Sequence, residues 1–389
     1  MAKYKLGDIC EIVSGSTPKT EIEEYWNGDI KWITPAELDD ESYIVYDTTR
    51  KITELAVKKT GLSSFPEGTV ILSSRAPIGK VAIAGCEMYC NQGFKNLICS
   101  EKIYNRYLFW FLKGNTEYLN SFGRGATFKE ISKKIVSDIE INVPEMNLQK
   151  KAVLNLERLS KIISLRKSEI DKLDALIRAR FFELFGDLVE GDKIKENRRK
   201  IGDIASVTKL AGFEFTKYIK YKDIGSIGDV IMLRGLNCKR GKIILDDIKW
   251  IERETSDLLP RSKLYIGDIL ITYAGTIGDV ALVDEDNKYH LAPNVGKITI
   301  IDKLSYDPVF LVHLLMYSNK YIMSFVSKVA QASINMQKIR NFEYYFPGFE
   351  KQKYFSTFVE QVNKSKVEVQ KALDKAQLLF DSLMQKYFG

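Results

Sequence analysis

The sequence predicts an α+β protein made of two tandemly repeated mixed α/β domains, each followed by a long helix. The two helices are expected to form an antiparallel coiled coil. Three observations carry this prediction: the chain repeats itself once, each repeat begins with short β-rich runs, and each ends in a segment with an apolar residue every seven positions. The length of 389 residues and the apolar fraction of 45% allow each half a core of its own.

The internal repetition extends from the beginning of each unit to its end. The matching segments are Lys5–Ile9 with Lys200–Ile204, Gly68–Ala82 with Gly267–Ala281, Val143–Gln149 with Phe346–Gln352, and Phe185–Gly186 with Phe388–Gly389. Because their order is the same in both halves, one fold has been duplicated. The predicted segments are residues 1–144 (first domain), 145–186 (first helix), 187–347 (second domain) and 348–389 (second helix).

Inside each domain, short apolar runs separated by turn residues predict strands. The expected strands include Val70–Leu72 and Val81–Ala84, with Ile269–Thr272 and Val280–Val283 as their counterparts. Between the strands and the end of each domain, apolar residues recur at helical spacing. These helical stretches are Tyr104–Leu119 and Pro308–Phe325.

The two long segments carry an apolar seam and contain no Gly or Pro inside it. The seam residues are Leu156, Ile163, Ile170, Ile177 and Leu184 in the first helix, and Phe355, Val362, Val369, Ala376 and Leu383 in the second. About forty residues at ~1.5 Å each give a rod of ~60 Å. A helix with one apolar seam needs a partner, and the other copy supplies it. Because each helix follows an equivalent domain, a pseudo-twofold relation makes the pair antiparallel.

The net charge of +7 is compatible with a phosphate-facing surface but does not establish one. Five cysteines without paired spacing suggest buried free thiols in a reducing compartment. The charged N-terminus lacks the apolar core of a signal peptide, and no apolar run is long enough to span a bilayer. We therefore expect a cytoplasmic protein without membrane contact.

Motifs for catalysis are missing. No Walker A loop and no glycine-rich cofactor fingerprint is found, and the methyltransferase motif of the Asp/Asn-Pro-Pro-Tyr type is absent. His290 and His313 are better explained as satisfied core or surface histidines than as catalytic groups. We expect no catalytic residue, no cofactor and no metal on this chain.

In combination, the repeated motifs resemble the specificity subunit of type I restriction–modification systems. The segments that carry the resemblance are Trp32–Pro35, Ser74–Gly79, Asn91–Phe94, Gly125–Thr127 and Ile141–Pro144 in the first copy, and Tyr273–Gly278, Gln331–Asn335 and Tyr345–Pro347 in the second. Each motif alone is weak, but their order occurs twice and covers the whole chain.

The resemblance implies that the globular parts are target recognition domains and that each reads one half of a split DNA site. It implies that the coiled coil sets the distance between the half-sites and docks two methyltransferase subunits. Two restriction subunits join the complex in systems that cleave DNA. S-adenosylmethionine then belongs to the methyltransferase subunits, and ATP with Mg²⁺ to the restriction subunits, while this chain binds double-stranded DNA.

The two copies differ where side chains could touch bases. Arg75 aligns with Ala274, and Lys80 aligns with Asp279, while the glycines of the turn are kept. Two different half-sites require this combination of a shared backbone and different side chains.

Base readout needs polar side chains that are held on exposed turns between strands. The candidates in the first domain are Lys19, Thr20, Thr34, Arg75, Gln92, Lys95, Arg124, Thr127 and Lys129. The candidates in the second domain are Arg234, Asn237, Lys239, Arg240, Tyr273, Thr276, Asn294, Lys297, Gln331, Ser333 and Asn335. For each of them the alternative is a solvated surface residue.

Two other functions stay open at this stage. One is a fused restriction–methylation enzyme or a free-standing nuclease, against which the missing cofactor motifs count. The other is a coiled-coil scaffold for protein-binding domains, which would show no salt-dependent DNA affinity.

Overall fold

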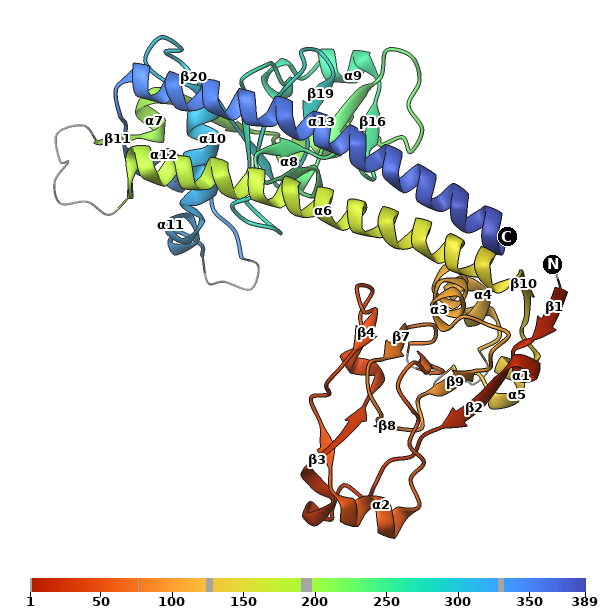
Figure 1. Cartoon of the computed structure of the whole chain (residues 1–389). Coiled ribbons are helices and arrows are strands. Elements are labelled where there is room, and N and C mark those ends of the chain that lie inside the picture. Colours follow the sequence, from red (N-terminus) through yellow and green to blue (C-terminus); the bar gives the residue numbers. More distant parts are fainter. Residues whose placement is uncertain (1, 76, 124–128, 190–197, 328–331) are drawn as a thin grey trace. The chain divides into compact units, whose positions relative to one another are not determined.

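The two repeats exchange the ends of their long helices. The computed structural model describes residues 2–75, 77–123, 129–189, 198–327 and 332–389, and its contacts divide the chain into two units (Figure 1). Unit 1 consists of Met1–Lys167 with Lys371–Gly389, and unit 2 consists of Ser168–Gln370. Each long helix therefore contributes residues to both units.

The described residues of unit 1 form three sheets. A five-stranded sheet has the order β2 (Cys10–Ser14), β9 (Lys95–Cys99), β6 (Val70–Leu72), β7 (Val81–Ala84) and β4 (Ile44–Val45). A three-stranded sheet has the order β5 (Lys51–Ile52), β3 (Trp26–Ile33) and β8 (Tyr89–Cys90), and β1 (Ala2–Lys5) pairs with β10 (Glu140–Val143). The helices are α1 (Leu6–Ile9), α2 (Glu54–Thr60), α3 (Asn105–Gly114), α4 (Thr116–Ser121) and α5 (Lys133–Asp138), with 3-10 turns η1 (Glu23–Tyr25) and η2 (Pro35–Glu37).

Unit 2 has counterparts of these sheets, with one strand fewer in the largest sheet and an additional two-stranded sheet. A four-stranded sheet has the order β12 (Ala205–Lys209), β20 (Val295–Ile300), β17 (Ile269–Thr272) and β18 (Val280–Leu282). A three-stranded sheet has the order β16 (Lys249–Ile251), β13 (Val230–Leu233) and β19 (Tyr289–Leu291). Two further sheets have two strands each: β11 (Arg198–Lys200) pairs with β21 (Glu343–Tyr345), and β14 (Cys238–Lys239) pairs with β15 (Lys242–Ile243). The helices are α7 (Ile201–Ile204), α8 (Gly212–Tyr218), α9 (Arg253–Asp257), α10 (Pro308–Tyr317), α11 (Asn319–Ser324) and α12 (Met336–Arg340), with η3 (Gly235–Asn237) and η4 (Pro260–Ser262).

The predicted α+β class is confirmed, and one detail of the helices is corrected. Each helical stretch expected between the strands and the domain end is broken into two helices, at Asn115 in unit 1 and at Ser318 in unit 2. The Asn115 side chain donates to the Phe111 carbonyl at 2.8 Å, and the Ser318 hydroxyl donates to the Leu315 carbonyl at 3.2 Å. Such side-chain bonds to nearby backbone compete with the helical ladder and end the first helix.

A buried glutamine attaches the start of each long helix to its own domain. In unit 1, Gln149 accepts from the Tyr104 amide at 2.8 Å and donates to the carbonyls of Lys102 at 3.0 Å and Pro144 at 2.9 Å. In unit 2, Gln352 makes the three equivalent bonds, to the Asp307 amide and to the carbonyls of Ser305 and Pro347. These bonds explain the Pro…Gln spacing at the end of each domain.

The long helices are α6 (Met146–Phe185) and α13 (Phe349–Phe388), and they pair antiparallel (Figure 1). In unit 1 the beginning of α6 lies along the end of α13, since Asn155 donates to the Tyr387 hydroxyl at 3.1 Å. In unit 2 the end of α6 lies along the beginning of α13, where the Phe181 and Phe355 rings are 5.4 Å apart. All ten predicted seam residues are buried or half-buried, as a coiled-coil seam requires.

Each globular core is completed by the helix end of the other repeat. The core of unit 1 packs against the half-buried Phe380, Leu383, Met384, Tyr387 and Phe388 of α13. The core of unit 2 includes the buried Ile177 and Phe181 of α6. Within the described ranges no helix has the length and hydropathy of a membrane span.

Substituting Phe388 with Ala should destabilise unit 1, although Phe388 belongs to the second repeat. Its ring lies 4.9 Å from Tyr107 and 6.0 Å from Phe111, so the change removes half-buried aromatic contacts and costs about 2 kcal/mol. Hydrogen exchange should show faster exchange in α3 and at the start of α6, with α10 unchanged. Leu378→Ala is the matched control, because Leu378 lies on the same helix and is 73% exposed. Equal effects of the two changes would contradict the shared core.

Candidate nucleic-acid interface

The turn of the β6–β7 hairpin in unit 1 and that of β17–β18 in unit 2 share one hydrogen-bond frame. In unit 1 the Ser73 hydroxyl donates to the Pro77 carbonyl at 2.7 Å and accepts from the Lys80 amide at 2.8 Å. In unit 2 the Thr272 hydroxyl donates to the Thr276 carbonyl and accepts from the Asp279 amide at 3.0 Å. The backbone of the turn is thus fixed by its own bonds, independently of the side chains that it presents.

Glycine is required in this turn. Gly79 and Gly278 have φ of +95° and +86°, which L side chains rarely adopt. A Cβ on Gly79 would also lie 2.7 Å from the Thr116 side chain, and one on Gly278 would lie 2.6 Å from Asn319. The first residues of α4 and α11 therefore pack directly against the turn, at Gly79 and at Gly278.

Three loops meet beside each turn through a second set of shared bonds. In unit 1 the Ser74 amide donates to the Gly93 carbonyl at 2.7 Å, and the Ile131 amide donates to the Ser74 carbonyl at 3.0 Å. In unit 2, Tyr273 makes the same two bonds with the Asn294 carbonyl and the Ile334 amide, both at 2.9 Å. We call these two places the loop junctions. The predicted DNA-contacting residues on the loops that form them are Arg75, Gln92 and Lys129 in unit 1, and Tyr273, Thr276, Asn294, Ser333 and Asn335 in unit 2.

At the loop junction of unit 1 the predicted residues differ in exposure. Arg75 is half-buried and pairs with Glu130 through its backbone, Gln92 and Lys129 are exposed, and Gln92 accepts from the Thr17 hydroxyl at 2.5 Å. That bond joins the loop of the exposed Lys19 and Thr20 to the junction. Thr34 is half-buried and caps η2 together with Glu37.

Lys95 has a structural role in the junction. Its side chain is buried, its ammonium donates to the Ser74 hydroxyl at 3.2 Å, and it forms an ion pair with Glu130 at 3.3 Å. A base contact by Lys95 would break this pair and take its buried ammonium away from the Ser74 hydroxyl. The structure therefore assigns Lys95 to holding Ser74 and Glu130 together.

At the loop junction of unit 2, Tyr273 takes the place that Ser74 has in unit 1. Its hydroxyl accepts from the Asn294 amide at 3.2 Å, and Asn294 is exposed with a φ of +68°. Ser333 pairs with Ala274 through its backbone. Thr276 and Asn335 are exposed on the adjoining turns, and Asn335 also caps α12 by accepting from the Lys338 amide.

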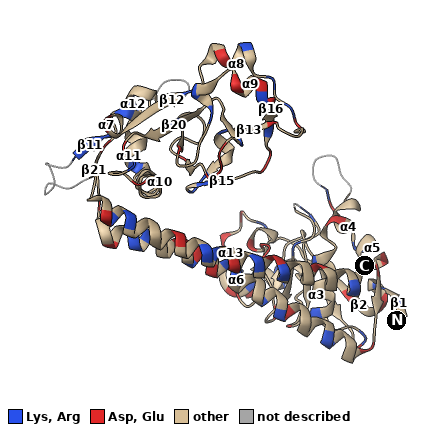
Figure 2. Ribbon diagram, turned by 90° about the horizontal axis from the view of Figure 1, so that it is seen from above, with Lys and Arg blue, Asp and Glu red and all other residues tan. Residues whose placement is uncertain are grey.

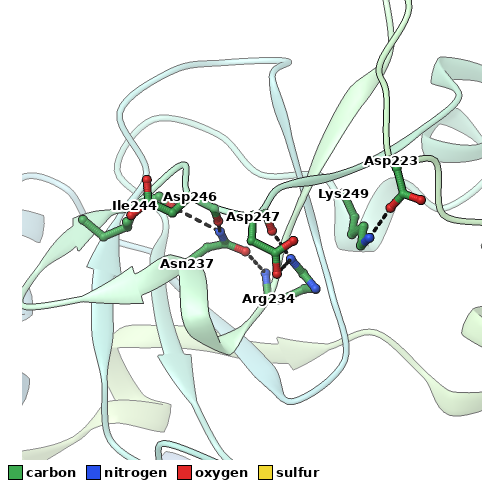
Figure 3. Close-up of polar contacts among 7 residues, drawn as sticks. All are labelled: Asp223, Arg234, Asn237, Ile244, Asp246, Asp247 and Lys249. Carbon is green, nitrogen blue, oxygen red and sulfur yellow. Dashed lines mark hydrogen bonds and ion pairs between the residues drawn. The ribbon is translucent and has the colours of Figure 1, made fainter. Parts of the chain in front are cut away.

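The four candidates between residues 234 and 240 are only partly available for DNA contacts (Figure 3). Asn237 is fully buried and donates to the carbonyls of Ile244 at 2.9 Å and Asp246 at 3.0 Å. Arg234 forms an ion pair with Asp247 at 3.1 Å. Burial and pairing thus correct the expectation of four solvent-facing groups, and only Lys239 and Arg240 are exposed.

Lys297 is also withdrawn from the surface. It is buried, and its ammonium donates to the Lys263 carbonyl at 2.9 Å and lies 4.0 Å from the Asp268 carboxylate. Burial lowers its pKa, and the Asp268 charge partly offsets this effect. Three further candidates, Arg124, Thr127 and Gln331, lie outside the described residues.

Two cations that the sequence patterns missed lie beside these loops. The Arg50 guanidinium stacks on Trp26, and the Lys209 ammonium lies 5.3 Å from the Tyr273 ring centroid. Neither stands in a turn motif, so no local pattern marks them. Over the two units, lysines and arginines alternate with acidic residues along α6 and α13, while cations gather at β11 and α12 (Figure 2).

The chain belongs to the family of the type I restriction modification DNA specificity domain. The family model matches residues 1–175 and again residues 197–378, so the two repeats are two copies of this domain. Among the relatives is the type I restriction enzyme MjaIX specificity subunit of Methanocaldococcus jannaschii, which is 40% identical over 186 residues, or 47% of this chain and 43% of that protein. The MjaVIII specificity subunit of the same organism is 24% identical, with 95% of this chain and 89% of that protein covered.

Solved structures agree on the fold. The S subunit of a type I restriction–modification system from M. genitalium aligns with a TM-score of 0.55 at 14% identity, covering 100% of this chain and 96% of that one. A chain from a structural study of complex assembly and conformational transition of the type I R-M system aligns with a TM-score of 0.62 at 16% identity, covering 100% and 97%. At these identities the likeness concerns the fold alone.

Burial of His290 predicts that unit 2 loses stability in acid. The ring is fully buried in β19, its Nδ1 lies 3.1 Å from the Leu291 carbonyl, and its Nε2 has no partner among the described residues. Burial lowers the pKa of His290 to about 4. The folded state therefore holds the neutral ring, and below the ordinary pKa of about 6.5 the unfolded chain binds more protons.

Stability of unit 2 should consequently fall as pH falls from about 6.5 toward 4. For His290 the loss between pH 7 and pH 5 is about 2 kcal/mol, since the unfolded state gains a proton that the folded state excludes. Urea titration of hydrogen-exchange protection in β19, at both pH values, measures it. His290→Gln should remove this part of the pH dependence, and an unchanged slope in the variant would exclude His290 as its source.

Proposed function

We propose that this chain is the specificity subunit of a type I restriction–modification enzyme, and that each unit reads one half of a bipartite, asymmetric DNA site. The observation that carries the proposal is the shared frame with different side chains. Both turns have the same bonds around Ser73 and Thr272, yet they present Arg75 in one unit and Ala274 in the other. Recognition of two different half-sites requires different base-contacting side chains, and here one shared backbone positions them in both units.

In this role the chain binds double-stranded DNA and carries out no chemistry itself. Two methyltransferase subunits with S-adenosylmethionine act on the DNA, and restriction subunits with ATP and Mg²⁺ join them in systems that cleave. Apolar side chains on the outer faces of the long helices support docking of the methyltransferase subunits. They include Leu148, Leu154, Ile162, Leu165, Leu176 and Phe182 on α6, and Tyr354, Val367, Leu378 and Leu379 on α13.

Two related grooves lie beside these helices and extend the proposed docking surface. In unit 1 a groove of about 690 Å³ lies between α3 and the long helices, with Trp110 and Phe380 in its wall. In unit 2 a groove of about 1050 Å³ lies between α10 and the long helices, with His313 and Ile177 in its wall. Their equivalence fits two copies of one partner, since one subunit can dock on each unit in the same way.

The test is selection of duplex DNA from a random pool by the full chain, co-purified with a methyltransferase subunit of a type I system, followed by sequencing. We expect two short, different sequence elements separated by a spacer of constant length. Exchange of residues 1–144 for the corresponding part of a relative should alter one element only. Methyl transfer by the chain alone would instead favour a fused enzyme. Binding without salt dependence or sequence preference would favour a scaffold.

Shortening the coiled coil should shorten the spacer. The Asn155–Tyr387 contact in unit 1 and the Lys366–Asp174 ion pair in unit 2 fix the helix register on either side of the middle. Removing Ile163–Glu169 together with Lys371–Gln377 takes one heptad from each helix, which keeps the seam and shortens the rod by ~10 Å. About three base pairs occupy the same rise, and they turn the second half-site by roughly a third of a turn.

The measurement is methylation of DNA in which the spacer is varied one base pair at a time. The shortened protein should prefer a shorter spacer or lose activity, while each half-site keeps its own sequence. If the shortened protein kept full activity on the parent spacer, the coiled coil would not be the element that sets the spacer length.

A further inference from the structure

An arginine in unit 1 is held on aromatic rings and not by a carboxylate. The Arg50 guanidinium lies 4.0 Å from the Trp26 ring centroid and 5.2 Å from that of Trp32. The two indoles meet edge to face at 5.1 Å. Arg50 is exposed, and no described residue offers its guanidinium a carboxylate within ion-pair distance. Arg106, Arg180 and Arg234, in contrast, all have acidic partners.

The chain builds this stack with an irregular strand. A β-bulge in β3 sets both Trp26 and Ile30 opposite Ile52, and Asn27 within it adopts a φ of +61°. A Cβ on Gly28 would lie 2.5 Å from the Ile52 carbonyl oxygen. Bulges bend a strand and redirect a side chain, and a non-glycine residue in the left-handed region costs free energy that must be repaid elsewhere. The local irregularity brings Trp26 beneath the arginine.

The backbone of Arg50 is fixed from the opposite side. Its carbonyl accepts from the Trp32 amide at 3.3 Å and from the Thr48 hydroxyl at 2.7 Å. The position of the Cα is therefore set by the sheet, and the planar group is set by the indole. A stacked guanidinium keeps its N–H donors in one plane and available, and it loses little rotamer freedom on binding.

The stack adjoins the loops of the candidate DNA surface. The Trp26 indole N–H donates to the Lys19 carbonyl at 3.3 Å, and that of Trp32 donates to the Ser16 carbonyl at 3.2 Å. The same loop reaches the junction through the bond from Thr17 to Gln92. Arg50 thus extends a surface on which Lys19, Gln92 and Lys129 are exposed.

We propose that Arg50 contacts a base edge in the half-site read by unit 1, with Trp26 as its positioning residue. This inference rests on the proposed function. An arginine whose donors lie in one plane matches the two acceptors of guanine in the major groove. In unit 2 the strand that corresponds to β5 is β16, where Trp250 lies opposite Ile231 and the neighbouring Lys249 is paired with Asp223 (Figure 3). The contact is therefore confined to one half-site.

The test compares the sequence preferences of variants in the same random-pool selection, using the full chain with its methyltransferase partner. Arg50→Ala and Arg50→Lys should both lose preference at one base pair of the first half-site, by about 10-fold to 100-fold, because neither keeps the planar pair of donors. The second half-site should be unchanged. Trp26→Leu should weaken the same preference, and Trp26→Phe, which retains an aromatic face, should restore it.

Lys58→Ala is the matched control, since Lys58 is an exposed cation of the same unit that is paired with Glu54. It should leave every base preference intact. If Arg50→Ala kept its base preference in the first half-site, with a fold that circular dichroism shows to be intact, the stack of Arg50 on Trp26 would have only a structural role. A loss of affinity that is equal for all sequences would make Arg50 a phosphate contact and would also overturn the proposal. If the wild-type chain selected no sequence, the proposed function itself would fall, and this outcome is recognised without any variant.

Discussion

The antiparallel pairing of α6 and α13 is the interaction on which the rest of the protein depends. A helix of 40 residues with one apolar seam is not stable in water by itself, and here each helix buries its seam against the other. The pairing also carries the end of each helix into the unit of the other repeat. Phe380 and Phe388 of the second repeat complete the core of unit 1, and Phe181 of the first repeat completes that of unit 2. Neither repeat therefore has a whole core without its partner.

Because of this exchange each repeat contributes to the core of both units. The loop junctions, in contrast, remain separate in the two units. The loop junctions are built from bonds within each unit, such as those from Ser74 to Gly93 and from Tyr273 to Asn294. Glycine at the turn, the hydroxyl of Ser73 or Thr272, and the helix beneath the turn are common to both units. The backbone tolerates exchange of Arg75, because none of these bonds uses its side chain. A duplicated fold with such junctions can change what it reads and keep its structure.

Burial separates the cations of the two units into groups with different tasks. Lys95 and Lys297 lie inside the units, where each has an acidic neighbour, Glu130 or Asp268. Lys95 connects segments of the loop junction in unit 1, and Lys297 donates to the Lys263 carbonyl. Lys19, Lys129 and Lys239 are exposed to solvent. The exposed group supports electrostatic attraction to phosphates, whereas the buried group supports the shape of the loops. The stack of Arg50 on Trp26 is a third arrangement, in which a cation is fixed in place and remains exposed.

The sequence by itself determined the duplication, the strands of the central hairpins, the two long helices and the seam along them. These features repeat over consecutive residues, so periodicity and turn residues report them directly. Only the tertiary structure decided that Lys95 is buried and that Phe388 packs against Tyr107. It also decided that Arg50 lies on Trp26. The physical reason is that burial and pairing depend on partners far away in the chain: Glu130 for Lys95, Tyr107 for Phe388 and Trp26 for Arg50.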